Sequence, residues 1–220
     1  MNNDDQTTEE DRLVAIMKDT RFRLATAIGA VLALHACADA QQDCIQDKDR
    51  DLQVRACTDI IRGDASAAWA YHNRANAYEA KGDYDRAIAD FTRVIELRPK
   101  FADGYNNLGV AYMKKGNYDR AIAEQTKALE IDSTTPEAFS YYFNRALAYP
   151  KAGKATQGLS DAERALQLSP NSAFALNARG QILEALGRRQ EAIADFRQAL
   201  AIDPNIEDSR EGLRRLGATP

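Results

Sequence analysis

The sequence predicts an all-α protein built as a linear array of helix pairs. Small residues recur at steps of 34, 37 and 34 residues, at Ala75, Gly109, Ala146 and Gly180. The same steps separate Tyr78, Tyr112, Tyr149 and Leu183, and also Ala87, Ala121, Gly158 and Ala192. A nearly fixed period of this length is typical of stacked supersecondary units, so the 220-residue chain is expected to form one elongated array.

Residues 1–40 differ from the rest and predict an N-terminal extension followed by a signal peptide. Three basic residues lie within 17–23, residues 24–36 are almost entirely apolar or small, and Ala38-Asp39-Ala40 has the pattern of a cleavage site. The apolar run is shorter than a membrane span requires. We therefore expect export to the periplasm with cleavage after Ala40. The acidic residues before Met17 indicate either that translation starts at Met17 or that the leader is long. An amphipathic or buried N-terminal helix is the alternative.

Cys37 offers a second way to end the leader. Acylation of Cys37 would attach the protein to a membrane as a lipoprotein with a structural role in an envelope assembly. His35 disfavours this reading, because a lipoprotein signal takes a small or apolar residue there. A membrane is therefore expected as a partner only if Cys37 is lipidated.

Two further cysteines indicate a degenerate first repeat at 41–67. Cys44 and Cys57 lie 34 residues before Tyr78 and Phe91, which are inward-facing positions of the next unit. Helices are expected near 42–47 and 51–62, and their cysteines could approach within the roughly 4.4–6.8 Å between Cα atoms that a disulfide needs. An even pair of cysteines suits an oxidising compartment. Two buried free thiols are the alternative, and a metal site would need more ligands.

Each complete unit is expected to hold two amphipathic helices joined by a glycine turn. In the first unit, Tyr71, Ala75 and Tyr78 form the apolar stripe of one helix, and Phe91 belongs to that of the other. Turn glycines lie at Gly82, Gly116, Gly153 and Gly187, and prolines close the units at Pro99, Pro136, Pro170 and Pro204. Acidic residues at the starts of the second helices, such as Asp83, Asp85 and Asp119, are interpreted as helix caps.

The third unit departs most from this pattern. Ser133, Thr134 and Thr135 are inserted before Pro136, which explains the 37-residue step, and Gly158 takes the place of an alanine. In the second unit, Gln125 occupies a position where a large core residue is expected.

These residues resemble the tetratricopeptide repeat family. The family pattern is met best by Tyr105, Leu108, Gly109, Tyr112 and Ala121, and by Ala192, Phe196, Ala199 and Pro204. The resemblance covers 68–206 and implies a right-handed superhelix of antiparallel helix pairs. It gives four repeats, at 68–101, 102–138, 139–172 and 173–206. A C-terminal capping helix and tail are expected at 207–220, where Leu213 and Leu216 lie among charged residues.

In this family, the face of each first helix that points away from its partner helix lines a concave groove. The corresponding residues here are Trp69, His72, Asn73, Asn76, Asn106, Asn107, Val110, Phe143, Asn144, Leu147, Phe174, Asn177 and Gln181. Their side-chain amides can donate to and accept from a peptide backbone, and the aromatic residues can anchor apolar side chains. The alternative is that the asparagines only solvate the groove or bond adjacent helices.

Some family members clamp a C-terminal carboxylate with lysine and arginine in this groove. Asn76 and Asn107 fit the neutral places of such a clamp, but His72, Ser140 and Asn144 occupy the basic ones. A carboxylate clamp is therefore not expected.

We expect a protein–protein interaction scaffold that binds a protein or peptide. The net charge of −4 and the lack of a basic patch disfavour nucleic acid. Outside the leader, His72 is the only histidine, and the sequence has no nucleotide-binding glycine loop, no metal-ligand cluster and no catalytic constellation. The sequence therefore predicts no enzyme activity, no cofactor and no metal. It does not determine the partner or the oligomeric state.

Overall fold

The computed structural model describes residues 39–219, and these residues form helices and connecting turns without any β-strand. A short helical segment at 39–45 comes first. The remaining helices are α2 (Arg50–Gly63), α3 (Ala68–Ala80), α4 (Tyr84–Leu97), α5 (Ala102–Lys114), α6 (Tyr118–Ile131), α7 (Ala138–Lys151), α8 (Ala155–Leu168), α9 (Ala173–Ala185), α10 (Arg189–Ile202) and α11 (Glu207–Arg215). The predicted signal peptide lies outside the described residues, apart from Asp39 and Ala40.

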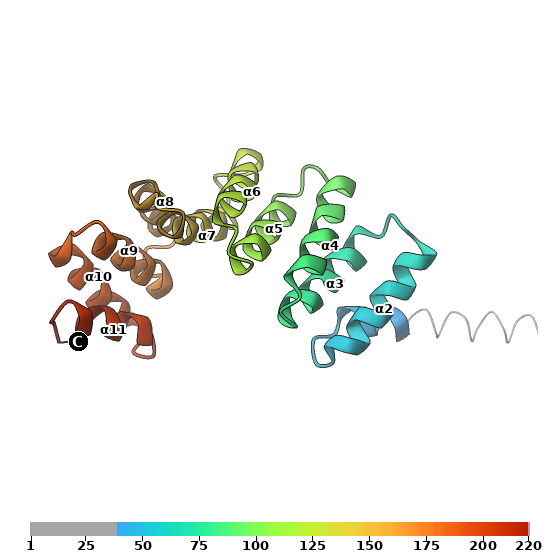
Figure 1. Ribbon diagram of the computed structural model, residues 1–220, viewed down its shortest axis with the longest axis horizontal. Helices are drawn as coiled ribbons and strands as arrows, with labels where there is room; N and C mark the ends of the chain where they lie inside the picture. Colours follow the sequence, from blue (N-terminus) through green and yellow to red (C-terminus); the bar gives the residue numbers. More distant parts are fainter. Residues whose placement is uncertain (1–38, 220) are drawn as a thin grey trace, which may run out of the picture.

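Consecutive helices stack side by side into a long, curved array whose two ends lie far apart (Figure 1). Helices α3 and α4, α5 and α6, α7 and α8, and α9 and α10 form four successive pairs. Glycines with φ between 73° and 85° end the turn inside each pair, at Gly82, Gly116, Gly153 and Gly187. Backbone in this left-handed region favours glycine, which has no Cβ atom to clash. The predicted all-α helical repeat array is confirmed.

The C-terminal end of the array is closed around one aromatic ring. Phe196 on α10 is fully buried, and it lies between Gly180 on α9 and Gly212 on α11. A Cβ atom at Gly180 would come within 2.7 Å of the ring, and one at Gly212 within 2.5 Å. Leu213 of α11 is also fully buried against this cluster. The short polar helix α11 therefore covers the apolar end of the last pair.

Two details differ from the expectations. Helix α7 starts at Ala138, one residue before the range 139–172 expected for the third repeat. The helix caps are Asp83 and Asn117, whose side chains accept hydrogen bonds from backbone N–H groups of the first turn. Asp85 and Asp119, which were also interpreted as caps, lie in the first turn, where a carboxylate favours the helix dipole, but they make no capping hydrogen bond. Each pairs instead with a lysine of the following repeat.

Candidate functional site

The predicted groove residues lie on the first helices of the pairs. Helix α5 contacts α7, α7 contacts α9, and a side-chain contact joins α3 to α5. We call the surface that the predicted residues of α3, α5, α7 and α9 form the odd-helix face. Its side chains fall into an amide-rich part on α3 and α5 and an aromatic part on α7 and α9.

His72 is the centre of the amide-rich part. Its Nε2 atom lies 2.9 Å from Nδ2 of Asn107 on α5, and its Nδ1 atom lies 3.4 Å from Nδ2 of Asn76 on α3. The imidazole ring packs edge-on against Phe91 and Phe101, with ring centroids 5.8 and 6.4 Å away. Burial lowers the pKa of His72, because removal from water disfavours the charged ring. The smaller effects of Asn73 and Asp103 act in the opposite direction.

Other amides also connect neighbouring repeats. Asn144 on α7 donates to Oδ1 of Asn106 on α5 at 3.0 Å. Asn177, which is buried, accepts a hydrogen bond of 2.8 Å from the hydroxyl of Ser209 on α11. Several of the predicted groove asparagines therefore bond adjacent helices, as the alternative interpretation stated. Asn106 and Asn177 are buried, so the groups that a partner could use belong to the exposed Asn76 and the half-buried Asn107 and Asn144.

Helices α5 and α7 are joined at a further point. The hydroxyl of Tyr141 donates to Oδ1 of Asp103 at 2.7 Å. Burial and this hydrogen bond raise the pKa of Tyr141 well above its ordinary value. The charge of Asp103 is therefore partnered within the array.

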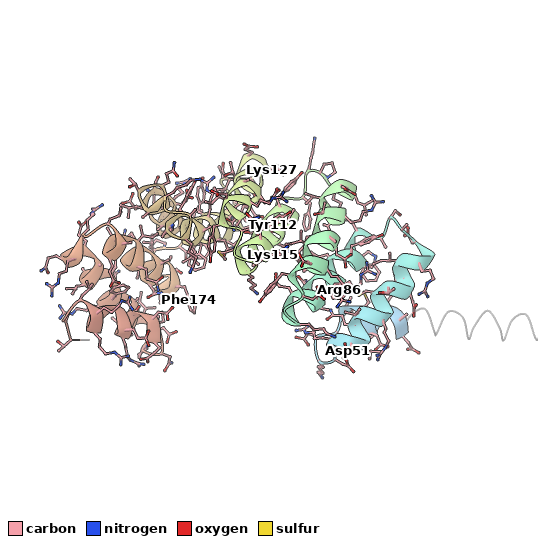
Figure 2. All side chains as sticks on the ribbon, in the orientation of Figure 1. Asp51, Arg86, Tyr112, Lys115, Lys127 and Phe174 are labelled. Atoms are coloured by element: carbon pink, nitrogen blue, oxygen red, sulfur yellow. A yellow bond between two sulfur atoms is a disulfide. The ribbon has the colours of Figure 1, made fainter. Side chains whose placement is uncertain are left out.

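The aromatic part contains one exposed ring and one stacked pair. Phe174, at the start of α9, has 63% of its surface exposed (Figure 2). Phe143 on α7 is half-buried and stacks on Phe139, with ring centroids 5.8 Å apart and planes at 8°. The groove prediction missed Phe139, although it lies one turn before Phe143 on the same face of α7. The exposed Phe174 ring is the clearest apolar contact point on this face.

Trp69 has a different neighbourhood from the other predicted residues. It lines a pocket of about 410 Å³ with Ala40 and Gln41 of the first helical segment and with Ile60 and Asp64 at the end of α2. The structure thus places Trp69 at the N-terminal end of the array, beside the degenerate repeat. Four more predicted residues are half-buried: Asn73, Val110, Leu147 and Gln181. Asn73 lies close enough to His72 to affect its pKa.

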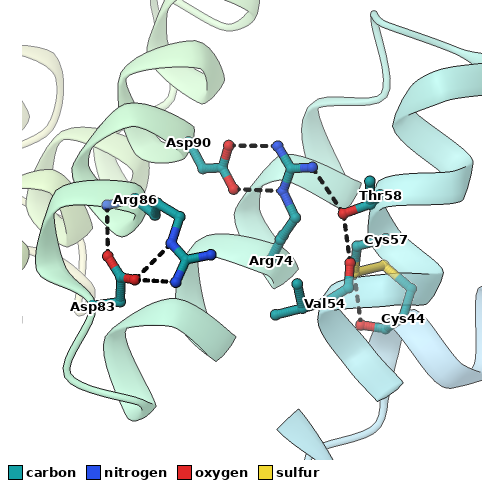
Figure 3. A network of polar contacts seen from close by, with 8 residues as sticks. All are labelled: Cys44, Val54, Cys57, Thr58, Arg74, Asp83, Arg86 and Asp90. Atoms are coloured by element: carbon teal, nitrogen blue, oxygen red, sulfur yellow. Dashed lines mark hydrogen bonds and ion pairs between the residues drawn. A yellow bond between two sulfur atoms is a disulfide. The ribbon is translucent and has the colours of Figure 1, made fainter. Parts of the chain in front are cut away.

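The sequence interpretation missed a repeated ion pair inside the helix pairs. Arg74 on α3 donates two hydrogen bonds of 2.7 and 2.8 Å to Asp90 on α4, and a third of 3.0 Å to Thr58 on α2 (Figure 3). The same two-bond pairing joins Arg145 to Asp161 and Arg179 to Asp195. An arginine followed 16 residues later by an aspartate was visible in three of the four units. These pairs hold the first helix to its partner in three of the four repeats.

A second missed feature is a row of bridges between the turns. Lys81 pairs with Asp51, and Lys115 pairs with Asp85 (Lys115 and Asp51 are labelled in Figure 2). Lys154 pairs with Asp119 at 2.8 Å. Each bridge joins one repeat to the preceding one.

Every junction between repeats has such polar contacts except one. Within residues 39–219, no side-chain hydrogen bond or ion pair joins α7 or α8 to α9 or α10. The packing at that junction is mainly apolar, with Phe139, Tyr142 and Phe143 against a cluster that includes Leu166 and Leu176. Glu163 of α8 lines a pocket with Arg179 and Arg188 but forms no ion pair with either.

The N-terminal end contains the two cysteines. Cys44 and Cys57 are fully buried and joined as a disulfide, with Cα atoms 4.8 Å apart (Figure 3). Gln53 donates to the backbone oxygen of Cys44 at 3.1 Å. The short first segment is thus tied to α2.

The described part of the chain provides no candidate metal site, since its His, Cys, Asp and Glu side chains nowhere gather in threes. None of the helices in 39–219 combines the length and apolarity needed to cross a bilayer.

Comparison with known proteins agrees with this architecture. Models of the tetratricopeptide repeat match residues 72–136 and 173–206. The chain is 31% identical over 80 residues to "Hsp70-Hsp90 organizing protein 1" of Glycine max, and 36% identical over 85 residues to "Mitochondrial import receptor subunit TOM34" of Rattus norvegicus. These matches cover 36% and 38% of this chain but only 14% and 28% of the relatives.

Solved structures share the fold at low sequence identity. A crystal structure of MamA superposes with a TM-score of 0.64 at 22% identity, over 71% of this chain and 90% of that one. YrrB, described as a TPR protein with an unusual peptide-binding site, superposes with a TM-score of 0.60 at 24% identity, over 74% of this chain and 82% of that one. The matched repeats, the helix pairs and these superpositions lead to one conclusion: the chain is a tetratricopeptide repeat protein.

Proposed function

We propose that this protein is an adaptor that binds an extended segment of a partner protein on the odd-helix face. The observation that carries the proposal is that one face combines the exposed ring of Phe174 on α9 with a row of side-chain amides on α3, α5 and α7. Aromatic residues frequently dominate the binding energy of protein interfaces. The amides supply hydrogen bonds that fix the orientation of the bound backbone.

The charges of the face favour an uncharged segment. Glu79 pairs with Lys114 at 2.6 Å, Asp103 accepts from Tyr141, and Glu184 pairs with Arg215 at 2.8 Å. Glu79 and Glu184 are thus paired with cations, and the Asp103 carboxylate is hydrogen-bonded within the array. Recognition then rests on hydrogen bonds at α3 and α5 and on an apolar side chain at Phe174.

The relatives support the general class of this function. The printed names describe an organizing protein for two chaperones and a subunit of an import receptor, and both roles involve contact between proteins. Because the chain spans a small part of these relatives, we carry over to it only their capacity to bind a protein segment. The identity of their partners is not carried over.

The proposed location is the bacterial periplasm, after cleavage behind Ala40. The disulfide between Cys44 and Cys57 supports this part, because such bonds persist in oxidising compartments. N-terminal sequencing of the native protein should begin at Gln41. A native chain that begins upstream, or one whose mass is the same with and without reductant, would contradict the location.

A substitution of the exposed ring tests the binding site. We expect Phe174→Ala to reduce the binding of the full chain to a library of random immobilised peptides by roughly tenfold, as for a dominant aromatic contact. Ile202→Ala is the matched control, because Ile202 on α10 is also exposed, at 43% of its surface, but lies outside the odd-helix face. Equal binding by both variants would place the site elsewhere.

A further inference from the structure

The contacts of His72 constrain which atoms of two asparagines remain free. Nε2 faces the amide of Asn107, and Nδ1 faces the amide of Asn76. A neutral imidazole has one N–H donor and one acceptor nitrogen. When both amides bond to the ring, one asparagine therefore donates an N–H and the other accepts with its carbonyl oxygen. This holds for either tautomer.

The two amides consequently present complementary groups to the odd-helix face. The amide that accepts from the ring keeps both of its N–H donors free, and the amide that donates keeps its oxygen free. One acceptor and several donors match the N–H and C=O groups of a peptide backbone, both of which need partners when they leave water. A terminal carboxylate only accepts, so it would meet a free amide oxygen that repels it.

Protonation of the ring changes this arrangement. An imidazolium donates from both nitrogens, so both asparagines must turn their oxygens toward His72. Both NH₂ groups then face outward beside a positive charge. Two amide donors next to a cation suit a carboxylate, because hydrogen bonds to charged groups are stronger than neutral ones.

The surroundings of His72 favour the neutral ring, because burial lowers its pKa. Helix α4 contributes Phe91, and the segment before α5 contributes Phe101, so two phenyl rings replace water. Asn73 on α3 and Asp103 on α5 favour the charged ring, but the Asp103 carboxylate also accepts from Tyr141 of α7.

The charged groups of α3 itself are already paired. Arg74 is bound to Asp90 of α4, and Glu79 pairs with Lys114 of α5. Neither pair contributes a free charge beside His72.

We propose that His72 selects the chemistry of the bound segment. The neutral ring selects uncharged, extended peptide backbone, and the protonated ring admits a chain end with a free carboxylate. This inference rests on the proposed function, because it assigns a ligand class to the same face. It concerns His72, Asn76 and Asn107, whereas the aromatic contact at Phe174 is independent of it.

The test uses the full chain and two libraries of random peptides attached to beads by their N-termini. The libraries are identical except that one ends in amides and the other in free carboxylates. The quantity measured is the ratio of the protein bound by the carboxylate library to the protein bound by the amide library. We expect this ratio to be below one at about pH 7.5. At about pH 5, it should rise by roughly tenfold.

Three variants separate His72 from other titrating groups. His72→Gln stays neutral, so its ratio should be the same at both pH values. His72→Lys carries a fixed charge and should favour the carboxylates throughout. Ala123→Lys adds the same charge on the exposed surface of α6 and should behave like the unchanged protein.

Each outcome decides between the two proposals. A ratio that does not shift in the unchanged protein, or that shifts equally in His72→Gln, overturns the role of His72 and leaves the adaptor function intact. If the unchanged protein binds neither library, the proposed function fails and the inference fails with it.

A measurement without peptides provides an independent check. Nitrogen NMR of the histidine ring reads its charge and tautomer, and the His72→Gln spectrum assigns the signal. A neutral ring with one dominant tautomer at about pH 7.5 supports the inference. A charged ring at that pH overturns it.

Discussion

Arg145 and Asp161 form a two-bond ion pair between α7 and α8, with Nε–Oδ2 and Nη2–Oδ1 distances of 2.6 and 2.8 Å. Both side chains are largely buried, with 15% and 8% of their surfaces exposed. Nη1 of Arg145 also donates to Thr126 on α6, so the guanidinium joins the third repeat to the second. In the second repeat, the corresponding positions hold Leu108 and Glu124. The fold therefore accepts an apolar residue at the first position.

Removal of one partner of this ion pair should lower the free energy of unfolding more than removal of both partners. Arg145→Leu leaves the Asp161 carboxylate buried without its cation, and we expect a loss of about 3–5 kcal/mol in the free energy of unfolding. The double variant Arg145→Leu, Asp161→Leu should lose clearly less. Urea denaturation followed by circular dichroism measures both. Equal losses would show that the pair stabilises the array by its net attraction.

Gln125 is a place where the protein can be made more stable. Its side chain is fully buried on α6, and neither its amide nitrogen nor its oxygen has a hydrogen-bond partner. Gln125→Met keeps the shape and removes the unsatisfied groups, so we expect a gain of about 1–3 kcal/mol. Gln53→Met is the matched control. Gln53 is also buried, but it donates to the backbone oxygen of Cys44, so the same change there should destabilise. A loss of stability in Gln125→Met would contradict the expectation.

Gly180 tests the close packing at the C-terminal end. In Gly180→Ala, the added Cβ atom would lie 2.7 Å from the buried ring of Phe196, so the ring or the helices must shift. We expect a loss of about 1–3 kcal/mol, as for other overpacked cores. Gly63→Ala has no atom within 4 Å of the new Cβ and should be neutral or slightly stabilising, because alanine favours helix. Thermal unfolding compares the two, and similar melting temperatures would refute the close contact.

The stability of the protein should depend on pH through His72. Its pKa is lowered by burial from the ordinary value of 6.5, so the unfolded chain binds a proton at higher pH than the folded one does. The contribution of the neutral His72 ring to the free energy of unfolding is fully present above about pH 6.5. It is lost as the pH falls below that value. Unfolding measured in urea at about pH 7.5 and about pH 5.5 should show a smaller decrease for His72→Gln than for the unchanged protein. Equal decreases would mean that His72 titrates alike in both states.

The repeat period and the turn glycines were sufficient to predict the fold. Gly82 and its equivalents require a backbone that few other residues adopt, so their spacing marks each helix pair. The cap at Asp83 also followed from its place before the second helix. These features are local, and a single sequence records them directly.

The contacts between repeats could not be predicted in the same way. The sequence placed Asn107 and Asn144 on one face of their helices, but it did not determine how far each helix is shifted along its neighbour. That shift decides that Asn107 meets His72 and that Asn144 meets Asn106. The pairing of Arg145 with Asp161 was different, because its spacing was visible. It was missed because the acidic residues were considered only as helix caps.

The apolar junction between the third and fourth repeats has a mechanical consequence. Hydrophobic contacts lose their strength over a short separation, and at this junction no directional bond between side chains of the described residues opposes a sliding movement. If the two ends of the array are pulled apart in an optical trap, we expect α9, α10 and α11 to separate first and together. The part of the chain that carries Phe174 would then respond to tension before the part that carries His72.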